Sequence, residues 1–91
     1  MTTMFVRHSV ADYATWKKGY DAFDAKRKAL GVTAQASYQS ATDPKDVTIT
    51  HNFASVEAAK AFASSAELKD AMQKAGVIGE PSIWYTTQTN S

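Results

Sequence analysis

Two stretches of the chain share one pattern, a strand followed by the start of a helix. Residues 4–12 can be aligned with residues 47–55, and in both stretches hydrophobic and polar side chains alternate before an Asp or a Ser that can cap a helix. Alternation is typical of a β-strand with one buried face, because successive side chains point to opposite sides. Two such units in 91 residues predict a single domain, residues 1–91, with the element order β-α-β-β-α-β.

The first predicted helix runs from a cap at Asp12 to Leu30. Its hydrophobic stripe repeats at steps of three and four residues, the spacing of one helix face, and consists of Tyr13, Trp16, Tyr20, Phe23, Arg27 and Leu30. The opposite face is charged, and residues 26–28, Lys-Arg-Lys, are expected to be a solvated helix end that complements the helix dipole. Gly31 follows where a left-handed cap is needed, and residues 32–39 alternate as a second strand.

The second half begins with a hairpin turn at residues 43–46, Asp-Pro-Lys-Asp. Residues 47–53 form the third predicted strand, and Ser55 caps the helix that follows. Residues 64–67, Ser-Ser-Ala-Glu, indicate a break and a second cap, so this helix should be kinked or split. After a proline, residues 82–87 are β-branched and aromatic and predict a final edge strand.

These elements predict the ferredoxin-like α+β fold. In this fold a four-stranded antiparallel sheet has the strand order 4-1-3-2 and carries both helices on one face. We expect the first and third strands to lie side by side at the centre of the sheet. The alignment of the two halves further predicts that these two strands run parallel, which would place His8 beside His51 at about 4.8 Å.

The second face of the sheet has no helix to cover it, so it must contact water or a partner. Trp84 and Tyr85 are adjacent, so one of them lies on this uncovered face, where Phe5 joins it. The other residues expected there are polar: Thr33, Gln35, Ser37, Thr48 and Thr50. Large aromatic side chains on a moderately polar surface are typical of an interface, so we predict a homodimer whose sheets pack face to face.

The composition excludes several classes of function. The net charge is +1, far from the clustered positive charge of nucleic-acid-binding proteins. The chain has no cysteine, which excludes disulfides and cysteine-based metal or thiol chemistry. It lacks a glycine-rich phosphate loop and a metal-ligand motif, so we expect no cofactor and no metal ion. Neither a signal peptide nor a run of ~20 apolar residues is present, so we expect a cytoplasmic protein that does not cross a membrane.

Three runs of the sequence resemble a known superfamily. They are HSVADYATWK at residues 8–17, FASVEAAKAF at residues 53–62 and ELKDAM at residues 67–72. With them the chain resembles the dimeric α+β barrel superfamily, in particular small uncharacterised bacterial relatives of the antibiotic-biosynthesis monooxygenases. The resemblance implies a dimer in which two sheets form a barrel, with a cleft between each sheet and its own helices.

In the oxygenase and haem-degrading branches of this superfamily, the cleft uses an Asn from a strand together with a Trp or a His. Asn52 has the opposite parity to His51 and is expected to face the barrel rather than the cleft. The role of the cleft Asn is therefore not transferred to Asn52.

Two histidines are the candidate catalytic residues. His8 and His51 occupy the apolar, helix-facing side of their strands, where burial and mutual repulsion would lower both pKa values and leave neutral imidazoles able to act as a base. Three interpretations remain open: imidazoles satisfied by neighbouring protein groups, a shared small-molecule pocket, or a metal site, for which no third ligand is evident. The candidate substrate-binding residues are Trp16, Tyr20, Phe23, Tyr38 and one of Trp84 or Tyr85, although an aromatic stripe also fits a plain core.

The sequence leaves two functions open. The protein is a homodimer that binds a small aromatic or apolar molecule in its cleft, or it is a cofactor-independent monooxygenase or isomerase acting on an aromatic or polyketide-like substrate. In the second case His8 or His51 is the base. A cleft of a few hundred Å³ would support a ligand site, whereas a cleft filled by Trp16 and Tyr20 would favour neither function.

Overall fold

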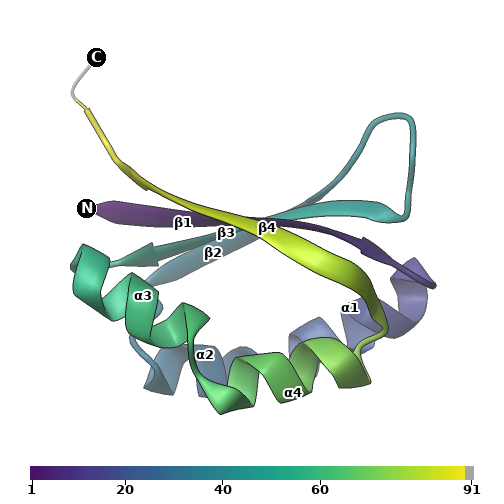
Figure 1. Cartoon of the computed structure of the whole chain (residues 1–91), viewed down its shortest axis with the longest axis horizontal. Coiled ribbons are helices and arrows are strands. Elements are labelled where there is room, and N and C mark those ends of the chain that lie inside the picture. The colour runs from purple at the N-terminus through teal and green to yellow at the C-terminus, as the bar shows by residue number, and fades with distance from the viewer. Residues whose placement is uncertain (90–91) are drawn as a thin grey trace.

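The computed structural model describes residues 1–89, which form a four-stranded sheet with helices packed on one face (Figure 1). The elements in chain order are β1 (Thr2–Val10), α1 (Tyr13–Ala22), α2 (Asp24–Ala29), β2 (Ala34–Gln39), β3 (Asp46–Phe53), α3 (Val56–Ala63), α4 (Ala66–Lys74) and β4 (Val77–Thr87). All the helices lie below the sheet in Figure 1, and no element of the described chain covers the opposite face. Among the described residues, no helix is long and apolar enough to cross a membrane.

The sheet has the strand order β2-β3-β1-β4, and every pair of neighbouring strands is antiparallel. The predicted ferredoxin-like order is therefore confirmed. The predicted parallel arrangement of β1 and β3 is wrong, because the helical crossover returns β2 parallel to β1 and the hairpin then reverses the chain into β3. The antiparallel register places His8 opposite Val47 and His51 opposite Met4.

Both helical regions are broken into two helices. The break in the second region was predicted, and Ser65 caps α4 by accepting a hydrogen bond from the backbone N–H of Leu68 at 3.2 Å. The break in the first region was not predicted, since one helix was expected up to Leu30. There the backbone N–H of Phe23 is shared between the carbonyl oxygens of Gly19 and Tyr20, the pattern of a tightened last turn that ends α1 before α2 begins.

The predicted caps are present at the other helix ends. The Asp12 carboxylate accepts a hydrogen bond from the backbone N–H of Thr15 at 2.9 Å, and the Ser55 hydroxyl accepts one from Ala58 at 3.2 Å. Gly31 follows α2 with a φ of +102°, a left-handed conformation that other residues adopt at a cost. These local signals fix where the chain leaves the sheet and where it returns.

Strand β4 is longer than predicted, since it begins at Val77 and not after Pro81. Its pairing with β1 shifts register between Arg7 and Ser9, where Gly79 has a φ of +70°. Proline has no N–H to donate to a sheet, so an irregular stretch of an edge strand is where it is tolerated.

The core lies between the sheet and the helices in two clusters. One cluster is centred on Phe53 and Phe62, whose ring centroids are 5.5 Å apart, and the other on Trp16, Val47 and Ile49. The helix-facing residues of the two central strands are all buried: Met4, Val6, His8, Val10, Val47, Ile49, His51 and Phe53. The two histidines are thus part of an otherwise apolar layer.

The uncovered face of the sheet carries large hydrophobic side chains. Phe5 and Trp84 stack nearly parallel with ring centroids 5.3 Å apart, which confirms that Trp84 rather than Tyr85 is on this face. Ile78 is 55% exposed. Asn52 accepts a hydrogen bond from the Thr3 hydroxyl on the same face, as its parity predicted.

The two faces of β2 are reversed relative to the prediction. Ser37 pairs with the buried Ile49, and Gln35 contacts Arg27 of α2, so these two polar residues lie on the helix side. Tyr38 pairs with Thr48 and is 57% exposed on the uncovered face. The expectation that Gln35 and Ser37 belong to the dimer face is therefore wrong, and Tyr38 takes that place.

Candidate binding cavity

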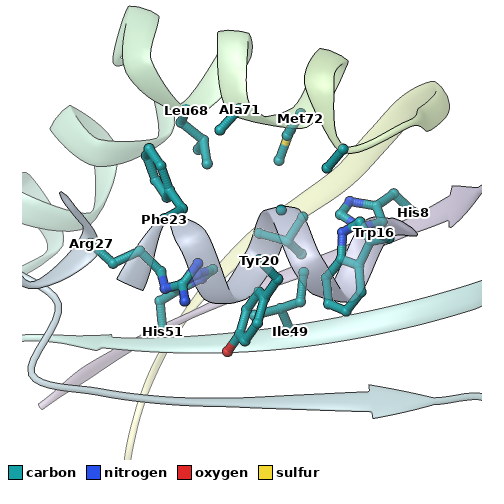
Figure 2. Close-up of a pocket in the computed structure, with 13 residues that line it drawn as sticks. His8, Trp16, Tyr20, Phe23, Arg27, Ile49, His51, Leu68, Ala71 and Met72 are labelled. Atoms are coloured by element: carbon teal, nitrogen blue, oxygen red, sulfur yellow. The ribbon is translucent and has the colours of Figure 1, made fainter. Parts of the chain in front are cut away.

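A cavity lies between the sheet and the helices α1, α2 and α4 (Figure 2). Its inner volume is about 40 Å³, room for a few atoms, and the space grows to about 410 Å³ when the part open to solvent is included. The walls are mostly apolar, and the titratable side chains that line it are His8, Tyr20, Arg27 and His51. A cleft therefore lies where one was expected, with a narrow inner part and a wider part open to solvent.

His8 lies at one end of the cavity, against Trp16. The two rings are arranged edge to face with centroids 5.9 Å apart, and His8 is only 5% exposed. Neither ring nitrogen has a hydrogen-bond partner. Burial lowers the pKa of His8, and the charge of Asp46 opposes this effect in part.

His51 lies at the other end of the cavity, where its ring packs 5.1 Å from Phe62. Burial lowers the pKa of His51 to about 4, and the positive charge of Arg27 adds to the effect. The imidazole is therefore neutral at physiological pH. Its Nδ1 atom is buried without a hydrogen-bond partner.

The predicted contact between His8 and His51 is wrong. In the antiparallel register His8 is opposite Val47, and His51 is four residues further along β3, which corresponds to about 13 Å. Figure 2 shows the two imidazoles at opposite ends of the cavity. A small ligand does not bridge them directly, and the charge that acts on His51 comes from Arg27 and not from His8.

Arg27 is a cavity residue, as its place on the hydrophobic stripe predicted, and the expectation that the whole run 26–28 is solvated is wrong for it. Its guanidinium is 3% exposed and lies 3.9 Å from the centroid of the Tyr20 ring. Its Nε donates to Gln35 Oε1 at 2.6 Å, and Gln35 Nε2 donates to Asp24 Oδ1 at 2.6 Å. Arg27 Nη2 has no hydrogen-bond partner, and Asp24 Oδ1 is 3.6 Å from it. Helix phase was the available signal, because Arg27 falls on the same stripe as Tyr20.

The aromatic candidates divide between the two faces of the sheet. Trp16, Tyr20 and Phe23 line the cavity, and the Trp16 and Tyr20 rings stack with centroids 5.0 Å apart. Tyr38 and Trp84 do not line it, because both lie on the uncovered face. Of the five predicted aromatic residues, the structure places three beside the cavity: Trp16 and Tyr20 on α1, and Phe23 at its C-terminal cap.

The chemistry open to this cavity is that of a neutral base, a cation and aromatic surfaces. In the described chain, no three His, Asp or Glu residues are grouped closely enough to hold a metal ion. His51 can accept or donate a hydrogen bond at Nδ1, and Arg27 can donate from Nη2. The aromatic walls suit a planar ligand.

Several solved structures share this fold over nearly its whole length. A candidate antibiotic biosynthesis monooxygenase from Bordetella bronchiseptica has a TM-score of 0.85 and 14% identity, over 98% of this chain and 97% of that chain. One from Caulobacter crescentus CB15 has a TM-score of 0.77 and 22% identity, over 98% and 90%. A variant of SnoaB, a cofactor-independent oxygenase from Streptomyces nogalater, has a TM-score of 0.78 and 10% identity, over 99% and 94%.

These structures confirm the resemblance expected from the sequence at the level of the fold. No protein-family model matches the chain, and no curated protein matches it in sequence. A shared fold at such identities carries many different activities, so function has to be argued from the cavity itself.

Proposed function

We propose that this protein binds a small aromatic or apolar molecule in the cavity between its sheet and its helices. The observation that carries the proposal is the combination of aromatic walls with buried nitrogen atoms that have no protein partner. Buried polar groups are normally hydrogen-bonded, so atoms of this kind at a cavity mark a place where a ligand group fits. The inner 40 Å³ is smaller than the roughly 150 Å³ cavity that holds a benzene ring. A ring therefore occupies the outer part and displaces the flexible side chain of Met72.

Fluorescence tests this proposal, because Trp16 lines the cavity and Trp84 does not. In a Trp84→Phe background, naphthalene and its derivatives should quench Trp16 with a saturable curve. Ala71→Leu adds bulk to the cavity wall and should weaken binding at least fivefold. Ala25→Leu makes the same change on the exposed side of α2 and should leave binding unchanged. Absence of saturable quenching, or equal affinities for the two Leu variants, contradicts the proposal.

The second candidate function is cofactor-independent oxygenation, favoured by the neutral His51 and by the description of SnoaB as a cofactor-independent oxygenase. His51 would take the proton of a phenol or enol, and the resulting phenolate or enolate would form a C–O bond with O₂ at carbon. The peroxide would then take the proton back from His51 to give a hydroperoxide. The hydroperoxide would then lose water, so that one oxygen atom stays as a carbonyl and the other leaves in water. O₂ uptake with an anthrone should fall at least tenfold in His51→Gln. His8→Gln tests the other predicted base, and equal uptake in wild type and both variants contradicts the reaction.

We also propose that the uncovered face of the sheet packs against the same face of a second copy. The supporting observation is a group of exposed hydrophobic side chains, Trp84, Tyr38 and Ile78, with the half-buried Phe5 stacked on Trp84. Sedimentation should give a mass near twice the 9.9 kDa of one chain at micromolar concentration. Phe5→Glu should yield monomer or aggregate, because it buries a carboxylate in the interface. Ala25→Glu, on the helix side, should leave the dimer intact, and a monomeric wild type contradicts the proposal.

A further inference from the structure

The cavity contains a buried cation with a free hydrogen-bonding position. Arg27 is 3% exposed, and its Nη2 atom has no hydrogen-bond partner. Burial lowers the pKa of Arg27, yet a guanidinium stays protonated at neutral pH. Arginine side chains are almost never buried to this extent without a paired anion.

The anion that the protein supplies is only partly available to Arg27. Asp24 is the nearest carboxylate, at 3.6 Å from Nη2, and it also binds Lys28 at 3.1 Å and Gln35 at 2.6 Å. The Asp24 side chain is 40% exposed, so solvent further weakens its field at the buried guanidinium. No Asp or Glu lines the cavity itself. A ligand anion at Nη2 would therefore compete only with the partly exposed Asp24, 3.6 Å away.

The guanidinium is held in one orientation. Gln35 fixes its Nε at 2.6 Å, and the Tyr20 ring lies 3.9 Å from its central carbon. Figure 2 shows the guanidinium between Tyr20 and His51. Two buried polar atoms at this end of the cavity have no hydrogen-bond partner, Nη2 of Arg27 and Nδ1 of His51. A planar cation held this way suits the oxygen atoms of a carboxylate or a phenolate.

We propose that Arg27 and His51 form an oxyanion-binding subsite for an acidic aromatic ligand, in which Arg27 Nη2 donates to the ionised oxygen and His51 Nδ1 supplies a second hydrogen bond. The inner 40 Å³ accommodates the charged head group, and the ring lies outward along Tyr20 and Phe23. The subsite rests on the proposed binding function and specifies its ligand as an aromatic acid.

Binding of three related probes to wild type, Arg27→Met and Lys28→Met tests the subsite. The probes are naphthalene, 2-naphthol and 2-naphthoate, which share a ring system and differ in charge. Wild type should bind 2-naphthoate at least tenfold more tightly than naphthalene, as expected for a charge-assisted hydrogen bond. Arg27→Met should lose this preference but still bind naphthalene. Lys28→Met removes an exposed charge next to Arg27 and should retain the preference.

The outcomes separate the subsite from the binding function. If naphthalene binds but 2-naphthoate is not preferred, or if Arg27→Met keeps the preference, the subsite is wrong and the cavity function stands. If no probe binds wild type, both are wrong. A pH-dependent gain for 2-naphthol near its own ionisation assigns the subsite to phenolates as well as carboxylates. If Arg27→Met does not fold, the side-chain ¹⁵N resonance of Arg27 in wild type decides: 2-naphthoate should shift it, and an unchanged resonance overturns the subsite.

Discussion

The buried histidine of the cavity predicts that the fold loses stability in mild acid. His51 has a pKa of about 4 in the folded protein because of burial and the charge of Arg27, whereas an exposed histidine has a pKa of 6.5. The unfolded chain therefore binds a proton at a pH where the folded chain does not. The contribution of His51 to stability is complete above pH 6.5 and is lost as the pH falls toward 4.

The size of this effect follows from the two pKa values. Their difference corresponds to about 3 kcal/mol, since one pKa unit is about 1.4 kcal/mol. That is a large share of the 5–15 kcal/mol that typically stabilises a small domain. His8 acts in the same direction, because burial also lowers its pKa.

Urea unfolding at several pH values between 7 and 4.5 measures the effect. The free energy of unfolding of wild type should fall by about 1 kcal/mol more per pH unit than that of His51→Gln, whose amide does not titrate. The carboxylates of Asp12, Asp24 and Asp46 have lowered pKa values and also lose stabilising contacts in acid, but they do so equally in both proteins. Parallel pH profiles for wild type and His51→Gln would refute the assignment of His51 as a buried neutral base.

Two further predictions concern the helix layer. Gly19→Ala should lower the free energy of unfolding by about 1–3 kcal/mol. The added Cβ would lie 2.9 Å from Cβ of Ala75 and force α1 away from α4. An unchanged thermal midpoint would show that these helices do not touch here. Ser65→Ala should cost about 1 kcal/mol by removing the cap of α4, as measured by urea unfolding. Ser64→Ala is the control, because the Ser64 hydroxyl donates to the Lys60 carbonyl and caps no amide, and an equal loss in both would contradict the cap.

The ends of the helices could be predicted from the sequence because capping residues mark them. Ser65 caps the N-terminus of α4 with its side chain, and Gly31 adopts a left-handed conformation after α2. Both residue types favour these roles. The relative direction of β1 and β3 could not be predicted from such residues. Aligning His8 with His51 in the sequence places them at equivalent positions of two similar units, but the hairpin before β3 reverses one unit relative to the other. Equivalent positions in an internal repeat are therefore not neighbours in an antiparallel sheet.

The burial of Arg27 within a run expected to be solvated and the exposure of Tyr38 have one physical cause. The alternation of polar and apolar residues divides β2 into two faces but does not show which face contacts the helices. The face with the apolar residues and Tyr38 was predicted to contact them. The helix side of this edge strand instead meets Arg27, a cation that needs a polar partner, and Gln35 provides it at 2.6 Å. Because successive residues point to opposite sides, turning Gln35 inward turns Tyr38 outward. The contact between Gln35 and the buried Arg27 therefore also places Tyr38 on the uncovered face, where it is exposed. In this way the polar partner that the cavity needs determines one residue of the proposed dimer surface.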